Sequence, residues 1–440
     1  MDVRINEYAQ RLSALIRVPT VSKTDQLDMR VFYQFHGLLR QLFPNLFARC
    51  EFREFRGTIL LRWPGRGEGQ PVLFMNHHDV VEAPGTWSHP PFSGEIAEGK
   101  IWGRGTLDTK TGLFAMLQAA EELISAGFIP LRDIWFLSTC NEEQSGFGAD
   151  TVSEYLLERG ERFFLVLDEG GMILSEPIAG AKGVYALVGV GEKGCVDLKF
   201  HAYSSGGHAS TPGKNTPLVR LGKFMAAAER KNLFPARFSP TVSEMFARIS
   251  RSMSGPAAFV LGHCRWFRPV LAEVLPLISG TAAAMLRTTL AFTMASGSAG
   301  ANVLPQEAWV IGNMRYSHHQ GGKASIDAVA KLARKFGVVT EVMDPGFDSP
   351  VSDYNSDAFQ LLEKAVAAVF PGVSTSPYIM TGASDCRYMS RISDNCLRFT
   401  PVLVSDKQLD SIHGVDENID ISALVPAVDF YRYLYQEGCV

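Results

Sequence analysis

The sequence predicts an α/β protein: a mixed, mostly parallel sheet flanked by helices, with an inserted α+β domain. Three observations predict this architecture. Short apolar runs such as 72–75 and 134–137 alternate with helical segments, which is typical of parallel strands covered by helices on both faces. Strand patterns then predominate between about 191 and 350, and the alternation of strands and helices resumes near 351. Finally, 440 residues are too many for one hydrophobic core, so two domains are expected.

The first part of the chain is expected to build the larger sheet. Ile5, Tyr8 and Leu12 recur at helical spacing, and Pro19 breaks this helix. Gly127 is a suitable C-cap for a second apolar-periodic helix. The elements expected here are helices at 4–17, 27–43, 111–126 and 149–158, and strands at 58–63, 72–76, 133–139 and 163–167.

A change of pattern near 191–194 begins the insert. The order of strand, helix-rich interval, two strands, helix and strand suits a small antiparallel sheet with helices on one face. The expected elements are strands at 195–203, 287–294, 307–316 and 338–343 with a helix at 324–336, and then a helix at 356–369, a strand at 397–403 and a helix at 421–435. We therefore expect a discontinuous main domain of residues 1–190 and 351–440, and an inserted domain of residues 191–350.

Composition and charge exclude several classes of protein. Apolar residues make up 46% of the chain and charged residues 20%, which is ordinary for a soluble globular protein. The net charge of −4 provides no basic surface, so we expect no nucleic-acid partner. The 7 cysteines are odd in number and lack CxxC spacing, and no apolar signal segment follows Met1. We therefore expect reduced thiols and a cytoplasmic protein.

One segment, 270–286, is apolar enough to suggest a membrane helix. It contains Glu273 and Pro276, and it is shorter than the roughly 20 residues that a membrane span needs. We therefore expect it to be buried in a lid or in a subunit contact, and we expect no membrane partner.

Polar residues cluster at 76–79, 103–110 and 141–143, at the edges of predicted elements. Polar residues just past the carboxyl ends of parallel strands lie where open α/β sheets build their sites. His77 and Asp79 are two residues apart, so on an extended chain they point the same way. One can bind a metal while the other fixes the imidazole by a hydrogen bond. Glu142 and Glu143 must diverge, so one can be a metal ligand and the other a free general base.

Three further residues complete a possible metal site. Asp108 lies between glycines and a helix start and could bridge two metals about 3.5–4 Å apart. Asp168 ends another apolar strand, and His413 is the candidate ligand from the returning half of the chain. Taken singly, an Asp at the end of a strand is more often a turn or helix-cap residue, and a Glu pair more often lies on the solvent-exposed surface. Together at one sheet edge, these residue types predict a hydrolytic metal site.

Other polar residues nearby are expected to be structural. Strand alternation points His78 away from the site, and Cys140, on a buried strand, is expected to be an inert thiol. Ser384 lacks a partner histidine at suitable spacing and a Gly-x-Ser-x-Gly turn, so we reject a serine nucleophile.

With these residues in place, the chain resembles the M20 metallopeptidases, and within them the carboxypeptidase S and N-acyl-amino-acid hydrolase-like branch. The branch rests on the long insert before the segment RTTLAFTM at 287–294. Two departures are the asparagine at 141, where an aspartate is commoner, and the absence of Pro-Gly after Arg315. The matching motifs span nearly the whole chain: HHDVV at 77–81, Trp87 with PPF at 90–92, GRG at 103–105 through Asp108 and Lys110, NEE at 141–143, LDEG at 167–170, GHAS at 207–210 with Pro212, NVLP at 302–305 and IHG at 412–414.

The resemblance implies a zinc-exopeptidase-like main domain that is catalytic and binds two zinc ions per chain, with Co²⁺ or Mn²⁺ as alternatives. One zinc would be held by His77, Asp108 and Asp168, and the other by Asp108, Glu143 and His413. Asp79 would orient His77, and Glu142 would be the general base. The family also implies a homodimer formed through the inserted lid domain, with His208 reaching the partner's active site. Asn302, Arg315 and Arg387 match positions that line the substrate site in relatives.

The expected reaction is hydrolysis of an amide bond in a small peptide or an N-acyl amino acid with a free carboxylate, with a metal-bound hydroxide as the nucleophile. Two arginines suit such a carboxylate because the guanidinium group can bind it with two hydrogen bonds. Two alternatives remain open. One is a narrow biosynthetic deacylase of the desuccinylase or deacetylase type. The other is a catalytically silent relative that serves as a binding module.

Overall fold

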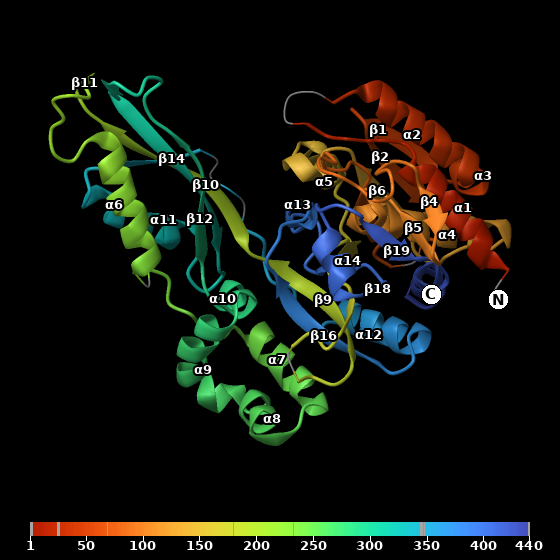
Figure 1. Ribbon diagram of the computed structural model, residues 1–440. Helices are drawn as coiled ribbons and strands as arrows, with labels where there is room; N and C mark the ends of the chain where they lie inside the picture. Colours follow the sequence, from red (N-terminus) through yellow and green to blue (C-terminus); the bar gives the residue numbers. More distant parts are fainter. Residues whose placement is uncertain are drawn as a thin grey trace.

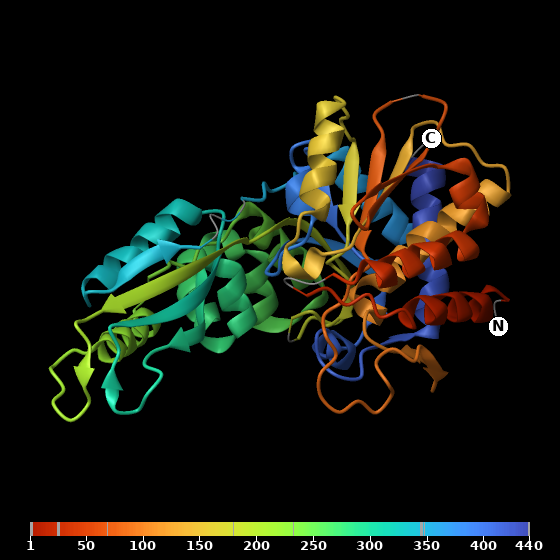
Figure 2. The same cartoon turned by 90° about the horizontal axis from the view of Figure 1, so that it is seen from above.

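The computed structural model describes residues 3–23, 27–67, 69–178, 180–231, 233–343, 346 and 348–438. A large mixed sheet flanked by helices forms the main body, and a smaller sheet extends from it to one side (Figures 1 and 2). This arrangement confirms the predicted fold class. The large sheet runs in the order β1 (Glu51–Phe55), β2 (Thr58–Trp63), β6 (Ile134–Thr139), β3 (Val72–His77), β7 (Leu165–Asp168), β17 (Cys396–Arg398), β9 (Val184–Glu192), β8 (Ile173–Ser175) and β18 (Leu403–Val404), with β16 (Val373–Met380) also paired to β9.

The central strands are buried on both faces, which explains their continuous apolar sequences. In β3, Val72 and Phe74 belong to one hydrophobic cluster, and Leu73 and Met75 belong to another on the opposite face. The first cluster includes side chains from helices on one side of the sheet, and the second includes side chains of α5 (Gly148–Glu158) and α13 (Cys386–Met389). The helices of the main body are α1 (Arg4–Ile16), α2 (Met29–Leu42), α3 (Pro44–Arg49), α4 (Thr111–Ser125), α5 (Gly148–Glu158), α12 (Asp357–Val369), α13 (Cys386–Met389), α14 (Asp406–Ser411) and α15 (Leu424–Tyr433).

The smaller sheet of the insert is antiparallel, with helices on one face, as the sequence predicts. Its strand order is β12 (Thr289–Ser296), β14 (Glu307–Tyr316), β10 (Gly194–Tyr203) and β15 (Val339–Val342). Helices α6 (Pro217–Arg230) and α11 (Gly322–Arg334) share a separate hydrophobic cluster with this sheet. A short hairpin of β11 (Gly207–His208) and β13 (Val303–Leu304) lies at the far end of the insert (Figure 1).

Four helices between β10 and β12 pack towards the main body: α7 (Pro240–Ile249), α8 (Gly255–Gly262), α9 (Cys264–Ile278) and α10 (Gly280–Leu286). α7 contacts β16, and its buried side chains belong to the same cluster as the core of the large sheet. These helices therefore share a core with the main body although the chain enters and leaves them through the insert. The domain boundaries at 190 and 351 stay a prediction.

One predicted segment differs from the structure, two strands were not predicted, and one expectation stays untested. The predicted strand 397–403 is two short strands, β17 and β18, because Pro401 lies between them and cannot donate to a ladder. Strands β9 and β16 were not predicted; β16 contains Pro377 and pairs with β9 alone. Within one chain, residues 270–286 are partly buried: Leu286 is fully buried and Leu277 is 84% exposed. Their expected burial in a lid or in a subunit contact stays a prediction. In the part of the chain that the structure describes, none of the helices combines the length and apolarity of a membrane span.

Candidate active site

The carboxyl ends of neighbouring parallel strands bring the first polar residues together. β6, β3 and β7 are adjacent and parallel. β3 ends at His77 and β7 ends at Asp168, while the 3₁₀ turn Glu142–Gln144 follows β6. Because parallel strands end at the same edge of a sheet, these three segments meet although they are far apart in sequence.

Asp79 is the buried acceptor that organises the residues around it. Its carbonyl oxygen lies 2.9 Å from Nδ1 of His77, and its Oδ1 lies 3.4 Å from the same nitrogen. The carboxylate also accepts hydrogen bonds from the backbone N–H groups of Glu142 (3.1 Å) and Glu143 (3.2 Å) and from the hydroxyl of Ser22 (2.6 Å). Asp79 therefore positions the imidazole and the glutamate pair together.

Asp108 lies between two imidazoles that come from opposite halves of the chain. Its Oδ1 is 3.0 Å from Nε2 of His77, and its Oδ2 is 3.0 Å from Nε2 of His413. Nε2 of His413 is also 3.1 Å from Oε2 of Glu143. His413 has a left-handed backbone with a φ of 59°, which is uncommon outside glycine and is often found at functional sites. The structure thus brings together four of the five residues predicted to bind metal.

The geometry and the donor atoms fit a divalent cation. One ligand atom each from His77, Asp108 and Glu143 can be chosen so that all lie within 4.8 Å of one another. Oε1 of Glu143 is buried and has no hydrogen-bond partner among the described residues. A buried carboxylate oxygen without a partner is costly unless a cation compensates its charge. Imidazole nitrogens and carboxylate oxygens are ligands for zinc and related divalent metals.

Asp168, the fifth predicted ligand, is buried and held by backbone donors. Its Oδ1 accepts a hydrogen bond from the N–H of Glu169 (2.9 Å), and its Oδ2 accepts one from the N–H of Cys386 (2.8 Å). It does not belong to the compact group of His77, Asp108 and Glu143. Its part in binding a metal therefore stays a prediction.

Hydrogen bonds between the imidazoles and the carboxylates shift their pKa values. Burial alone would lower the pKa of His77, but hydrogen bonds with Asp108 and Asp79 raise it well above its usual value. Hydrogen bonds with Asp108 and Glu143 raise the pKa of His413 to about 10. Burial would raise the pKa of Asp108, but its bonds to the two imidazoles lower it. The arrangement therefore favours a charged Asp108.

The remaining carboxylates at this sheet edge have raised pKa values. Burial is the largest cause for Glu142, whose pKa is well above its usual value, and the nearby Asp385 and Glu169 raise it further. Burial and the charge of Asp168 likewise raise the pKa of Glu169. Burial also raises the pKa of Asp385 to about 7. Acidic groups with strongly shifted pKa values that gather in one place are typical of active sites.

Glu417 joins the loop that carries Asp108 to the loop that carries His413. Its carboxylate is 2.5 Å from Nη1 of the buried Arg104. It also accepts hydrogen bonds from the N–H groups of Gly105 (3.0 Å), Leu107 (2.7 Å) and Asp108 (3.2 Å). Gly105 is needed in this turn, because its φ is 88° and a Cβ would lie 2.7 Å from Val80. We call this set of contacts the Glu417 clamp.

The Glu417 clamp also fixes the loop that carries His413. Nη2 of Arg104 donates to the carbonyl of Gly414 at 2.7 Å, and the N–H of Gly103 donates to the carbonyl of Glu417 at 2.8 Å. The loop that supplies Asp108 therefore donates both backbone and side-chain hydrogen bonds to the loop that supplies His413.

Two predicted site residues lie on the insert, at the far end from the large sheet. His208 is exposed on β11, the short strand labelled at the end of the insert in Figure 1. Its Nδ1 lies 2.7 Å from the hydroxyl of Ser210. Asn302 is exposed beside it and accepts a hydrogen bond from the N–H of Ala209. These residues do not join the cluster around Asp108 within one chain.

The two predicted substrate arginines occupy different places. Arg315 is on β14, where its Nε donates to Asn313 at 3.1 Å and its Nη1 is buried without a partner among the described residues. Arg387 is buried on α13, directly after Asp385 and Cys386, whose N–H holds Asp168. Arg387 therefore lies on the segment next to the candidate metal site, and Arg315 belongs to the insert sheet.

His78 and Cys140 have the structural roles that the sequence predicts. Nδ1 of His78 lies 2.7 Å from the hydroxyl of Ser138, its ring stacks on Phe35, and burial lowers its pKa well below the usual value. Cys140 is a buried free thiol beside Thr58, and burial raises its pKa to about 12. A thiol that resists ionisation is a poor nucleophile.

Sequence reasoning missed three acidic residues of this region: Glu169, Asp385 and Glu417. Glu169 directly follows Asp168, so its position after a strand was an available signal. Asp385 and Glu417 lie on returning segments that no periodicity places near the site. Only the packing of the folded chain shows that they surround it.

Comparison with known proteins agrees with this fold and this set of residues. The chain belongs to the peptidase family M20/M25/M40, whose pattern it matches over residues 73–437. It is therefore an enzyme of a hydrolase family, and members of the family include metallopeptidases.

Relatives and a solved structure cover nearly the whole chain. The chain is 33% identical to "Probable carboxypeptidase S-like 2" of Dictyostelium discoideum, over 97% of this chain and 84% of that protein. It is 30% identical to the human "N-fatty-acyl-amino acid synthase/hydrolase PM20D1", over 98% of this chain and 87% of that protein. Its fold is similar to that of the M20 family metallo-carboxypeptidase Sso-CP2 from Sulfolobus solfataricus, with a TM-score of 0.71, 14% identity and 99% of each chain covered.

We expect the substitution Glu417→Gln to lower the free energy of unfolding by about 3–5 kcal/mol, because it leaves the buried Arg104 without its counter-charge. It should also weaken metal binding by about 10–100-fold, because the loops of Asp108 and His413 lose their common support. Urea denaturation and a metal titration measure the two effects.

The matched control is Glu51→Gln, which removes an exposed ion pair with Arg62. Its effect should stay below about 1 kcal/mol. If both substitutions cost the same, the Glu417 clamp does not support the site as described.

Proposed function

We propose that the protein is a metal-dependent hydrolase that cleaves the amide bond of N-acyl amino acids or small peptides with a free carboxylate. The observation that carries this proposal is the placement of Asp108 between His77 and His413, with Glu143 in contact and Glu142 next to it in sequence. The names of two relatives, a carboxypeptidase and an N-fatty-acyl-amino acid synthase/hydrolase, support the type of bond.

This site would hold two divalent cations, and zinc is the first candidate for both. His77, Asp108 and Asp168 would hold one, and Asp108, Glu143 and His413 would hold the other. When bound, such cations lower the pKa of a water molecule and stabilise negative charge on the carbonyl oxygen of a substrate. Asp79 would keep Nε2 of His77 directed at the cation by contacting Nδ1.

Glu142 would be the general base and then the general acid. Its side chain is separate from the contacts between His413, Glu143 and Asp108, and its backbone N–H is fixed by Asp79. Glu142 would take a proton from the attacking water and deliver it to the leaving amine. Burial raises the pKa of Glu142, so this carboxylate is a stronger base than an ordinary one, which suits the removal of a proton from water.

Arginine side chains would select a substrate with a free carboxylate. Arg387 is buried beside the segment that holds Asp168, and Arg315 keeps an Nη1 without a partner among the described residues. A planar guanidinium with free N–H groups binds a carboxylate with two parallel hydrogen bonds. Asn302 would add a polar contact to the substrate.

We further propose that the enzyme is a homodimer and that His208 serves the active site of the partner chain. The exposure of His208 and Asn302 at the far end of the insert supports this arrangement, since neither residue joins the site of its own chain. In the partner's site, the imidazole of His208 would polarise the carbonyl group that is cleaved.

The substrate class is tested with a panel of N-fatty-acyl amino acids, N-acetyl and N-succinyl amino acids and dipeptides, each with and without a chelator. We expect hydrolysis of fatty-acyl amino acids or dipeptides that stops on metal removal and returns with Zn²⁺, Co²⁺ or Mn²⁺. Hydrolysis confined to a single N-acetyl or N-succinyl substrate would identify a narrow biosynthetic deacylase instead. Turnover that survives complete metal removal would contradict the proposed chemistry.

The neighbouring glutamates should separate catalysis from metal binding. Glu142→Gln should retain metal but lose turnover by about 10²–10⁴-fold, because no base remains. Glu143→Gln should lose both, because it removes a ligand. Elemental analysis and kcat measurements on the same preparations give the metal content and the turnover of each variant. We expect two metal equivalents per chain for the unchanged protein. Near-normal turnover of Glu142→Gln would show that another group is the base.

Mixing two inactive variants tests the role of His208. Glu142→Gln supplies an intact His208, and His208→Ala supplies an intact Glu142. If His208 acts across the dimer, subunit exchange creates one complete site in each mixed dimer and restores about a quarter of the unchanged activity. If His208 acts within its own chain, the mixture shows only the average of the two parent activities.

A further inference from the structure

Helices α8 and α9 present a continuous apolar surface to the solvent. Side chains on it are strongly exposed: Trp266 by 75%, Val270 by 62%, Leu277 by 84% and Ile278 by 73%. Single exposed apolar residues are normal, but a contiguous group of this kind marks a surface that contacts another body. We call it the apolar face; its members are Phe259, Trp266, Val270, Val274, Leu277 and Ile278.

The packing of α9 determines which side of this helix forms the apolar face. Trp266, Val270 and Val274 recur every four residues and therefore form one stripe along the helix. The opposite side is buried at Cys264 and Leu271. Side-chain contacts tie that buried side to α7: the thiol of Cys264 donates to the carbonyl of Ser243, and Arg268 donates to its hydroxyl at 3.1 Å.

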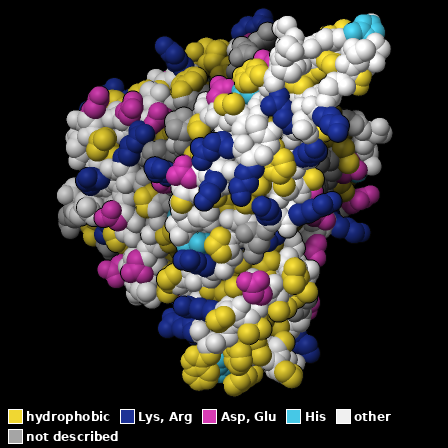
Figure 3. All heavy atoms as spheres, turned by 90° about the vertical axis from the view of Figure 1, so that its left-hand side faces the viewer, with side chains coloured by type: hydrophobic (Ala, Val, Ile, Leu, Met, Phe, Trp, Pro, Cys, Tyr) yellow, Lys and Arg dark blue, Asp and Glu magenta, His cyan; other side chains and the backbone are white. Residues whose placement is uncertain are grey.

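The end of the apolar face near the turn between α8 and α9 is aromatic. The ring of His263 lies 4.5 Å from that of Phe259 and 5.2 Å from that of Trp266, measured between centroids. Aromatic side chains with a polar atom favour the boundary between water and an apolar phase. In the space-filling view, apolar side chains gather at the lower end of the molecule with basic side chains above them (Figure 3).

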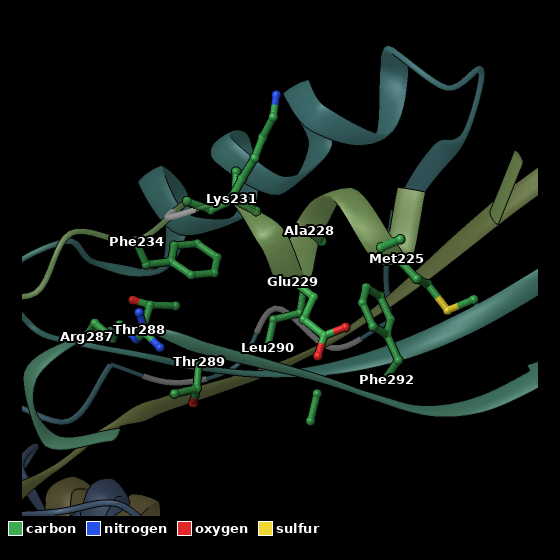
Figure 4. A pocket seen from close by; sticks show the side chains of 13 residues that line it. Met225, Ala228, Glu229, Lys231, Phe234, Arg287, Thr288, Thr289, Leu290 and Phe292 are labelled. Carbon is green, nitrogen blue, oxygen red and sulfur yellow. The ribbon is translucent and has the colours of Figure 1, made fainter. Parts of the chain in front are cut away.

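The segment that carries the apolar face is basic, although the whole chain has a net charge of −4. Residues 229–287 contain eight Lys or Arg residues and three Asp or Glu residues. Three of the basic residues, Arg230, Lys231 and Arg287, line a hollow of about 190 Å³ beside α9 together with Leu277, and two acidic residues, Glu229 and Glu273, line it as well. Lys231 and Arg287 also line the adjoining cavity of about 630 Å³ between α6 and β12 (Figure 4).

The size and charge of this surface favour one kind of contact. α9 has 15 residues with Pro269 and Pro276 inside it, so it cannot cross a bilayer but can lie along its surface. A second copy of the chain would bring two basic segments together across a symmetric contact, which like charges oppose. An anionic surface attracts the same segment.

We propose that the apolar face docks the protein on the surface of an anionic lipid bilayer. α9 lies in the plane of the interface, Trp266 and Leu277 enter the boundary between headgroups and acyl chains, and the Arg and Lys residues of this segment face the anionic headgroups. This contact is peripheral. It differs from the sequence expectation of no membrane partner, and it does not depend on the proposed substrate.

The test is co-sedimentation of the full chain with vesicles of phosphatidylcholine containing about 30% phosphatidylserine, compared with phosphatidylcholine alone. We expect binding to the anionic vesicles that weakens several-fold when NaCl rises from about 0.1 to 0.5 M. The double substitution Trp266→Ser with Leu277→Ser should weaken binding by at least about 10-fold, because both apolar side chains leave the interface.

The matched control, Tyr33→Ser with Leu157→Ser, removes two apolar side chains of the main body that are 49% and 42% exposed. It should bind vesicles like the unchanged protein, and both double variants should melt at the same temperature. Failure of the unchanged protein to bind anionic vesicles at low salt overturns the proposal, and so does equal binding by the two double variants. Light scattering on the same samples measures the oligomeric state. If only the variant with both Trp266→Ser and Leu277→Ser dissociates, the apolar face is a subunit contact and the proposal is overturned.

Discussion

A single buried carboxylate, that of Glu417, joins the two segments on which the candidate active site depends. It contacts Arg104 and the N–H of Leu107, which lies 310 positions away in the sequence. A buried ion pair of this kind adds little net stability, but removal of either partner leaves an uncompensated charge. Its main effect is therefore to specify one arrangement, in which the loops of Asp108 and His413 lie side by side.

The same principle of local compensation governs the rest of this sheet edge. Asp79 is compensated by two backbone N–H groups and a hydroxyl, and Asp168 by two backbone N–H groups. Glu192, further along the sheet, is compensated by Arg398 and by Ser384. Compensation is missing at Oε1 of Glu143 and at both carboxylate oxygens of Asp385, which are buried without hydrogen-bond partners in the described part of the chain. The edge therefore combines satisfied acceptors with buried carboxylate oxygens whose charge a cation would compensate.

The insert carries His208 and the apolar face on a continuous hydrogen-bonded support. β10 follows β9 after Lys193, whose Nζ donates to the carbonyl of Arg287 and the hydroxyl of Thr289. β10 then pairs with β14 along its whole length, up to the level of Tyr203 and Glu307. His208 at the far end and the apolar face near the main body are thus connected by hydrogen-bonded strands and not by loose loops.

The sequence by itself determined the features that depend on local periodicity. Alternating apolar runs and helices predicted the mixed sheet, and the ends of its strands predicted His77 and Asp168, because side chains at a strand end share one sheet edge. Only the tertiary structure decided which distant segments meet that edge. Glu417 lies in a loop without periodicity, so no local pattern could pair it with Arg104. The apolar residues of α9 likewise showed that this helix needs a contact. Its packing on α7 decided which side is exposed, since apolar side chains lie on both its buried and its exposed side.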